Sequence, residues 1–343
     1  MSKAVGMMIG NGFPESTEAA RDVLEAVGDF TFRDALIGEA AIDDTGDPLP
    51  LVSRRVAKAS HAILLGPLHR PEWEADPDAP AAAHPYTALD TLVKTIDARA
   101  YVQPVRSFDA LADLSPRRRG NPVRVDLLLV HALDPDHADS RPPEEGDVYD
   151  FEYSREEIGD VARIAFELAR IRGDETSQQP YLASFDTSSA IKMSPEWSEI
   201  MDALKTEEFT DVRLEHMLAD NPGREIDARP MAFDVLVGDS LFGDSARDVT
   251  AAMTAPGLLP AGLLSPARRG IYMPAQDEGV DNVYGSVMAA AAALRYSLDM
   301  PHEAGHVEDA VGRSLADGVR TPDLGGDAAP EDVTAAILGN LRL

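Results

Sequence analysis

Short apolar runs alternate along the chain with segments of helical periodicity. The runs KAVGMMIG, HAILLGP, VDLLLVHAL and FDVLVGD each suit one buried strand, and the segments ESTEAARDVLEAV and PYTALDTLVKTI, which follow the first two, repeat with the period of a helix. Strands that alternate with helices are typical of an α/β fold. We therefore expect an α/β protein.

The most regular helical pattern extends from about Ser154 to Ile171. Its apolar residues form one stripe, and Arg and Glu lie opposite. Gly173 is the predicted end of this helix, because glycine readily adopts the left-handed conformation of a helix terminus. Two stretches rich in Pro and Asp, at 71–85 and 134–154, are predicted to be surface loops. The second is a candidate for an arm between two lobes.

The composition narrows the possible functions. The chain has 343 residues, of which 44% are hydrophobic, enough for a sizeable core. Its formal charge of −29 argues against a nucleic-acid partner, because binding to phosphates requires a basic surface. Cysteine is absent, so disulfides and thiolate chemistry are excluded and any metal must bind to oxygen or imidazole ligands.

The first residues, MSKAVGMMIGNGF, contain only a short apolar run. That run is too short for a secretory signal or a membrane span. We expect a cytoplasmic protein with no membrane partner.

Seven phrases resemble those of the β-decarboxylating dehydrogenases, the isopropylmalate/isocitrate family. They are GEAAIDDTGDPLP, HAILLGP, EIGDVARIAFELAR, LEHMLADN, FDVLVGDSLFGD, GLLP and TPDLGG. They occur in the order of that family and cover nearly the whole chain. The resemblance implies a two-lobed α/β fold with a mixed sheet. It also implies a homodimer with clefts shared between subunits.

The resemblance further implies a division into two lobes. A large, discontinuous lobe is expected from residues 1–124 and 237–343, and a smaller central lobe, which includes the dimer-forming arm, from residues 125–236.

Three aspartates match the positions at which the family binds Mg²⁺ or Mn²⁺: Asp220, Asp244 and Asp248. Asp244 and Asp248 are four residues apart near the start of a predicted helix, so their carboxylates share one face, where a hard cation could bind. The resemblance places Asp220 at the end of a strand, possibly from the partner subunit. Alternatively, Asp244 only stabilises the amino end of the helix and Asp248 is a solvated surface residue.

The family grips its dicarboxylate substrate with three arginines, and none of them is present here. The matching positions are Gln103 in YVQP, Asp113 in ADLSP and His131 in VHAL. A guanidinium pairs with a carboxylate through two hydrogen bonds, which these residues cannot reproduce. A malate-like dianion is therefore an unfavourable substrate. His131 and Asp113 could equally be a buried, hydrogen-bonded histidine and a solvated acid.

The catalytic Tyr and Lys of the family are also replaced. The Lys position corresponds to Thr187 in FDTSSA, and the Tyr position falls near Ala138. Tyr149 and Tyr153 lie near in sequence and are candidates to substitute for that Tyr. We take Thr187, His131 and Tyr153 as the candidate catalytic residues.

The NAD(P) site is expected to be weakened. The adenosine loop of the family is reduced here to PAQDEGVDN, in which Asn282 matches an adenine-contacting residue. Tyr86 occupies the position of a glutamate that faces the nicotinamide, and we count it among the substrate-binding candidates. Gly10 and Gly12 form only a lone GxG motif after a strand, which is usually a tight turn.

Three functions remain open. The first is a divalent-metal-dependent enzyme that acts on a small polar substrate other than malate, by a non-redox step such as decarboxylation, elimination or hydrolysis. The second is an NAD(P)-dependent oxidoreductase of an atypical hydroxy acid. The third is a catalytically silent subunit that binds a partner or regulates it. The sequence does not choose among them, because a fold does not fix a function.

Overall fold

The computed structural model describes most of the chain. The described residues are 2–10, 14–68, 84–85, 87–114, 124–133, 153–186, 196–218, 222–275 and 282–342. Within these ranges no helix is both long enough and apolar enough to cross a membrane.

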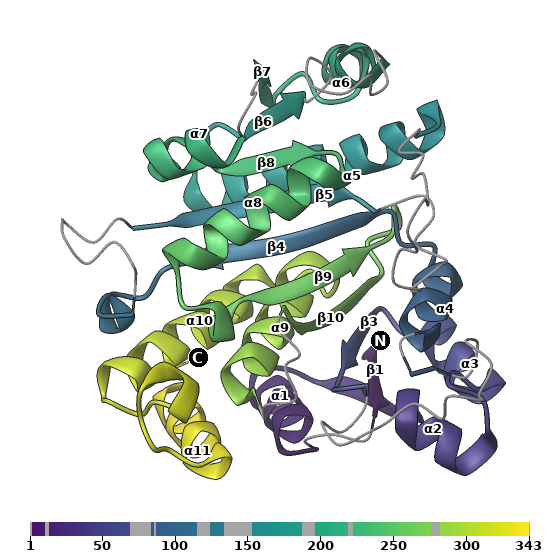
Figure 1. The fold of residues 1–343 in the computed structure, drawn as a ribbon, viewed down its shortest axis with the longest axis vertical. Helices are drawn as coiled ribbons and strands as arrows, with labels where there is room; N and C mark the ends of the chain where they lie inside the picture. The colour runs from purple at the N-terminus through teal and green to yellow at the C-terminus, as the bar shows by residue number, and fades with distance from the viewer. Residues whose placement is uncertain are drawn as a thin grey trace, which may run out of the picture.

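One sheet runs through the whole molecule (Figure 1). Its strand order is β2-β1-β3-β10-β9-β4-β5-β8-β6-β7. The strands are β1 (Lys3–Ile9), β2 (Phe30–Leu36), β3 (Ala62–Leu65), β4 (Ala100–Arg106), β5 (Asp126–Ala132), β6 (Tyr181–Asp186), β7 (Arg213–Leu218), β8 (Val235–Gly238), β9 (Pro260–Leu264) and β10 (Gly270–Pro274). Strand β9 is antiparallel to both β10 and β4, and β4 is antiparallel to β5, whereas the outer strands pair in parallel. The predicted mixed α/β sheet is confirmed.

The helices cover both faces of this sheet. They are α1 (Pro14–Val27), α2 (Gly38–Thr45), α3 (Leu51–Ala59), α4 (Thr87–Ile96), α5 (Arg155–Thr176), α6 (Glu196–Glu207), α7 (Pro222–Ala228), α8 (Ser240–Met253), α9 (Val283–Tyr296), α10 (Pro301–Ala316) and α11 (Pro330–Asn340). Figure 1 shows α8 in front of β5 and β4, with α5, α9 and α10 on the opposite face.

The predicted start of helix α5 agrees with the structure, but its predicted end is wrong. Ser154 forms a capping box with Glu157, and the helix continues past Gly173 to Thr176, where Ser177 adopts the left-handed conformation. Gly173 is buried, and a Cβ there would lie 2.7 Å from Cγ of Pro180. The glycine therefore allows close packing of the chain and does not end the helix.

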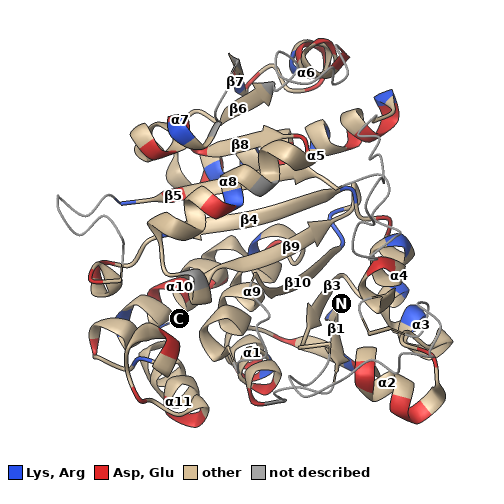
Figure 2. Ribbon diagram, viewed as in Figure 1, with Lys and Arg blue, Asp and Glu red and all other residues tan. Residues whose placement is uncertain are grey.

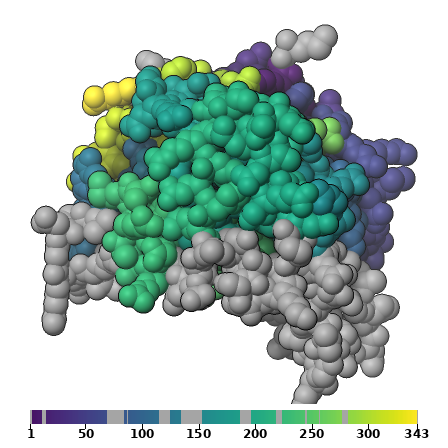
Figure 3. Space-filling view, turned by 90° about the horizontal axis from the view of Figure 1, so that it is seen from above, coloured from purple at the N-terminus to yellow at the C-terminus, as the bar shows by residue number. Residues whose placement is uncertain are grey.

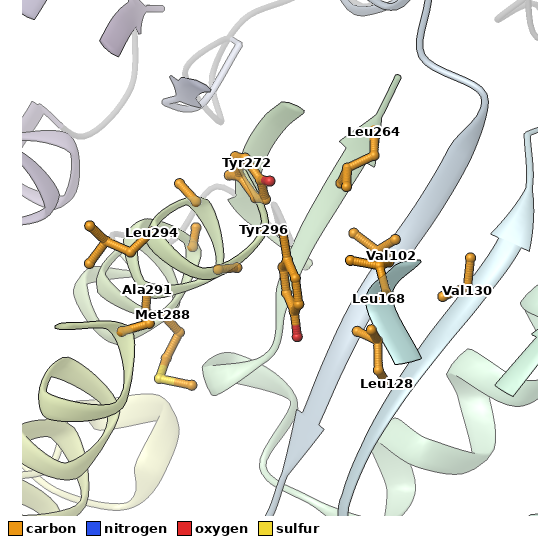
Figure 4. Packing of buried hydrophobic residues seen from close by; sticks show 14 of the residues in the cluster. Val102, Leu128, Val130, Leu168, Leu264, Tyr272, Met288, Ala291, Leu294 and Tyr296 are labelled. Carbon is orange, nitrogen blue, oxygen red and sulfur yellow. The ribbon is translucent and has the colours of Figure 1, made fainter. Parts of the chain in front are cut away.

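On one face of the sheet, which we call the continuous face, a single apolar cluster joins all parts of the chain. Strands β4 and β5 contribute Val102, Leu128 and Val130, and α5 contributes Leu168. Figure 4 shows these side chains together with Tyr272 of β10 and with Met288, Ala291, Leu294 and Tyr296 of α9. Contacts of this kind tie the first, central and last thirds of the sequence into one core.

The opposite face, which we call the split face, holds two separate apolar clusters. One lies between α3, α4 and the strands β1, β3, β9 and β10, and it ends at Tyr101 of β4. The other lies under α7 and α8 and begins at Val105 of the same strand. Between Tyr101 and Val105, the residue that points to this face is Gln103, because side chains alternate along a strand.

Charged residues lie mainly on the helices and loops, whereas most strand residues are uncharged (Figure 2). Seen along the sheet from its β7 end, the molecule shows mainly the middle of the chain, coloured teal to green (Figure 3). The N-terminal and C-terminal segments appear at the margins of that view.

Candidate functional site

Three side chains form a polar seam on the split face. Tyr101, Gln103 and His131 come from the neighbouring strands β4 and β5, where Tyr101 pairs with His131 and Gln103 pairs with Leu129. Their exposed fractions are 7%, 2% and 5%. Two of these residues, Gln103 and His131, are substrate-binding candidates from the sequence, and the structure places them on neighbouring strands.

His131 is packed between a ring and a helix. Its imidazole stacks on Tyr101 with 4.7 Å between ring centroids, and Nδ1 lies 2.9 Å from the carbonyl oxygen of Ala132. A Cβ at Gly243 of α8 would also come within 2.2 Å of the imidazole. Only a glycine at this position lets α8 lie directly on the histidine.

Gln103 is a buried amide between the two apolar clusters of the split face. Its Oε1 has no hydrogen-bond partner among the described residues. A buried amide oxygen without a partner costs free energy, and such groups in native proteins usually serve a ligand, a water or a functional purpose. The side chain therefore retains hydrogen-bonding capacity in the seam.

Side-chain hydrogen bonds hold the first turn of α8, the helix that packs on His131. Asp239 caps it by accepting a hydrogen bond from the amide of Phe242 at 2.7 Å. The hydroxyl of Tyr153, which is buried beside the start of α5, donates to Oγ of Ser240 at 2.9 Å. In this structure the candidate catalytic residue Tyr153 thus anchors the first turn of α8.

The metal candidates Asp244 and Asp248 are both residues of α8, one turn apart. The carboxylate of Asp248 is exposed, whereas the side chain of Asp244 and all of Asp220 lie outside the described part of the chain. Among the residues that are described, no group of three or more acids and histidines is close enough to hold a metal ion. Of the predicted set, the structure thus describes one exposed carboxylate, that of Asp248, which is an oxygen donor of the kind that Mg²⁺ and Mn²⁺ prefer.

Arg247 is a site residue that the sequence analysis missed. Its guanidinium carbon lies 4.7 Å from the centroid of the Tyr101 ring, a cation–π contact. Arg247 is four positions after Gly243, and helical residues at this spacing lie on the same face. The contact between Gly243 and His131 therefore indicates that Arg247 also faces the seam.

Tyr101 and Arg247 also line a cavity of about 170 Å³. This cavity extends from the seam to the carboxyl ends of β3 and β10, where Gly66 and Pro274 border it. Asn282 lines it as well and caps α9 by accepting from the amide of Gly285 at 2.8 Å. Clefts at the carboxyl ends of parallel strands are the usual ligand sites of α/β proteins.

The family model for isocitrate/isopropylmalate dehydrogenase matches residues 4–340. The chain belongs to the isocitrate/isopropylmalate dehydrogenase family. It is similar to the 3-isopropylmalate dehydrogenase of Halalkalibacterium halodurans, with 34% identity over 98% of this chain and 96% of that protein. It is 36% identical to the 3-isopropylmalate dehydrogenase of Heyndrickxia coagulans, over 94% of this chain and 91% of that protein.

A solved isocitrate dehydrogenase structure from Methylococcus capsulatus has the same fold. It superposes with a TM-score of 0.78 and covers 99% of this chain and 100% of that one at 22% identity. The resemblance drawn from the motifs is thereby confirmed.

The third substrate candidate, Asp113, lies elsewhere in this family member. Its Oδ2 accepts a hydrogen bond from Nη1 of Arg320 at 3.1 Å, near the 3-10 segment η2 (Asp109–Leu111) beyond the carboxyl end of β4. Asp113 follows the end of β4 at which Arg106 pairs with Asp126, and this is the opposite end of β5 from His131. The structure thus separates Asp113 from Gln103 and His131.

Gly10 is explained by packing. A Cβ at Gly10 would come within 1.8 Å of the carbonyl oxygen of Pro67, so only glycine allows the end of β1 to approach that backbone. Gly12, Tyr86 and Thr187 lie outside the described residues, as do Ala138 and Tyr149.

Proposed function

We propose that this family member is a divalent-metal-dependent enzyme that acts on a small polar substrate other than a malate-like dianion. Its reaction is proposed to be a non-redox step such as decarboxylation, elimination or hydrolysis. The substrate lies in the cavity and seam of the split face, and the metal is held by Asp220, Asp244 and Asp248.

One observation carries this proposal: no guanidinium is present at the three positions that correspond to the substrate arginines. Gln103 and His131 are buried under α8, and Asp113 pairs with Arg320. Two carboxylates placed in the seam would lack the guanidinium groups that the resemblance implies for them, and one metal ion cannot replace three bidentate partners, so their desolvation is costly. The dianion of a malate is therefore rejected.

The residues of the seam suit a polar substrate. The unpartnered amide oxygen of Gln103 can accept a hydrogen bond from a hydroxyl or amine. His131 is held in place by Tyr101 and by α8, so its ring presents a fixed orientation. When bound, Mg²⁺ or Mn²⁺ would act as a Lewis acid that polarises a substrate oxygen.

A homodimer is part of this proposal. Asp220 belongs to the predicted central lobe, 125–236, whereas Asp244 and Asp248 follow it. We propose that Asp220 reaches the metal site of the partner subunit. The described residues of the predicted central lobe lie at the β7 end of the molecule (Figure 3), and we propose that a second copy contacts this end.

The test is metal binding. Calorimetry with Mn²⁺ on the purified protein is expected to show saturable binding, which Asp248→Asn weakens at least about tenfold by removing a charged oxygen ligand. The control is Asp22→Asn, which removes an exposed carboxylate from α1. With Mn²⁺ and NAD⁺ present, 3-isopropylmalate is expected to yield no NADH. Equal Mn²⁺ affinity in all three proteins, or NADH production, contradicts the proposal.

A second candidate is an NAD(P)-dependent oxidoreductase of an atypical hydroxy acid. It is favoured by Asn282, which lines the cavity, and by the relatives named 3-isopropylmalate dehydrogenase. Micromolar binding of NAD⁺ or NADH in the same calorimeter would establish it. Binding of neither metal nor nucleotide would instead support a catalytically silent subunit.

A further inference from the structure

Two histidines lie one turn apart near the start of α10. They are His302 and His306, in the segment PHEAGHVED. Residues four apart on a helix share one face, with about 5–6 Å between their Cβ atoms. Two imidazoles at this spacing can reach one metal ion, and His-x-x-x-His on a helix is a known arrangement of zinc ligands. The pair is separate from the seam, because α10 and α8 cover opposite faces of the sheet (Figure 1).

Both imidazoles are available to a ligand. His302 is exposed and His306 is partly exposed, and neither ring forms a hydrogen bond or an ion pair with the described part of the chain. In His306 the buried ring nitrogen is Nδ1, which leaves Nε2 for a ligand. Other histidines are engaged: Nδ1 of His61 accepts from a backbone amide at 3.1 Å, and His216 pairs with Asp202 at 3.1 Å. The two rings on α10 are therefore free to bind an ion.

The surface beside the pair is open. A Cβ at Gly305, the residue before His306, would meet no atom within 4 Å beyond its own neighbours in the helix. There is thus room beside the imidazoles for an ion and its water ligands. In the described part of the chain, no third acid or histidine lies near enough to complete a three-residue metal group. Water must supply the remaining ligands, as it does in metal sites with open positions.

The type of donor atom selects the ion. Imidazole suits Zn²⁺, Ni²⁺ and Cu²⁺, whereas carboxylates suit Mg²⁺ and Mn²⁺. The positive amino end of a helix disfavours a cation. This effect is offset by Glu303, which lies in the same first turn, and by the formal charge of −29, which attracts cations to the chain. The pair therefore favours a late transition metal ion, unlike the aspartates of the proposed function.

An ion at this place would stabilise a helix end that has no side-chain cap. The N-cap residue of α10, Met300, makes no capping hydrogen bond through its side chain, so the amides of the first turn lack that partner. His302 and His306 come within reach of one ion only when the segment is helical, so binding stabilises the first two turns. The same helix carries Glu308, which forms the buried ion pair with Arg295.

We propose that His302 and His306 bind one late transition metal ion, of the class Zn²⁺, Ni²⁺ or Cu²⁺, and that this ion holds the first two turns of α10. Each imidazole provides one ring nitrogen, and water completes the coordination. The site goes beyond the proposed function, because it has a different set of donor atoms and lies on the other face of the sheet.

The first test is calorimetry with Ni²⁺ in the presence of millimolar Mg²⁺, which occupies oxygen ligands and competes poorly for imidazole. We expect the wild-type protein to bind one Ni²⁺ ion with micromolar affinity. His302→Gln and His306→Gln should each weaken this binding at least about tenfold, because a chelate needs both rings, and the double variant should weaken it little further. The matched control is His216→Gln, which removes a 28% exposed imidazole from β7 and should leave the affinity unchanged.

The second test is thermal unfolding followed by circular dichroism. Saturating Ni²⁺ should raise the unfolding midpoint of the wild-type protein by a few degrees and leave that of His302→Gln unchanged. This variant should fold normally, because His302 is exposed.

No Ni²⁺ binding at micromolar concentrations, or equal affinity in the wild-type protein and the His302 and His306 variants, overturns the proposal. Binding without a shift of the midpoint overturns the stabilisation of α10. Asp248→Asn should leave Ni²⁺ binding unchanged, so the site on α10 and the proposed function on α8 stand or fail separately.

Discussion

The two faces of the same sheet are built differently. On the continuous face, one apolar cluster runs from α1 to α11 and includes residues of both predicted lobes. On the split face, two clusters are separated by Tyr101, Gln103 and His131, and the cavity opens beside them. The difference shows that one face is a continuous apolar core, while on the other face buried polar side chains interrupt the core.

Buried ion pairs strengthen the continuous face. Arg295 of α9, 9% exposed, donates to Glu175 of α5 at 3.0 Å and also pairs with Glu308 of α10. Burial alone would lower the pKa of Arg295, but the charge of Glu308 and other neighbours raise it above its ordinary value. These ion pairs connect α5 to α9 and α10, so they stabilise the packing of these three helices on the continuous face.

The largest expected effect is therefore on the continuous face. Arg295→Met should lower the free energy of unfolding by about 3–5 kcal/mol, because Glu308 would keep a buried charge with one partner fewer. Urea denaturation followed by circular dichroism measures this. Arg163→Met, which breaks an exposed pair with Glu208, should cost no more than about 1 kcal/mol. If the two variants lose similar amounts of unfolding free energy, the buried ion pairs do not stabilise the continuous face more than an exposed pair does.

A smaller effect is expected where α8 lies on the seam. Gly243→Ala should destabilise the protein by about 1–3 kcal/mol, because the new methyl group meets the ring of His131. Adding His131→Ala should recover part of the loss. Gly305→Ala, in α10 with no neighbour within 4 Å, should stabilise the protein by up to about 1 kcal/mol. A neutral Gly243→Ala in thermal unfolding would mean that α8 is not held against the histidine.

The smallest effect has the opposite sign. Gln103→Met should raise the free energy of unfolding by up to about 1 kcal/mol, because it replaces an unpartnered buried amide with an apolar side chain. The reverse change at its strand neighbour, Leu129→Gln, should lower it by about 1–3 kcal/mol. Denaturant titration of both variants measures these changes in the free energy of unfolding. If Gln103→Met instead lowers the free energy of unfolding, the amide of Gln103 has a hydrogen-bond partner in the folded protein. The description of Gln103 as an unpartnered polar group between the two clusters would then be wrong.

The sequence by itself determined the order of elements and the family. Alternation of apolar and polar residues follows from local geometry, so it predicted the α/β class and the start of α5 near Ser154. The family motifs also singled out Gln103 and His131, which do lie on neighbouring strands. Secondary structure and family motifs can be predicted from the sequence because they depend on residues that are close together along the chain.

Only the tertiary structure decided which residues meet. It placed Arg247 over Tyr101, about 150 positions earlier in the chain, and paired Asp113 with Arg320 away from the seam. It engaged Tyr153 with Ser240, and it showed that Gly173 serves packing and not the end of a helix. These contacts depend on how strands from distant segments lie side by side, and no periodicity in the sequence encodes that arrangement.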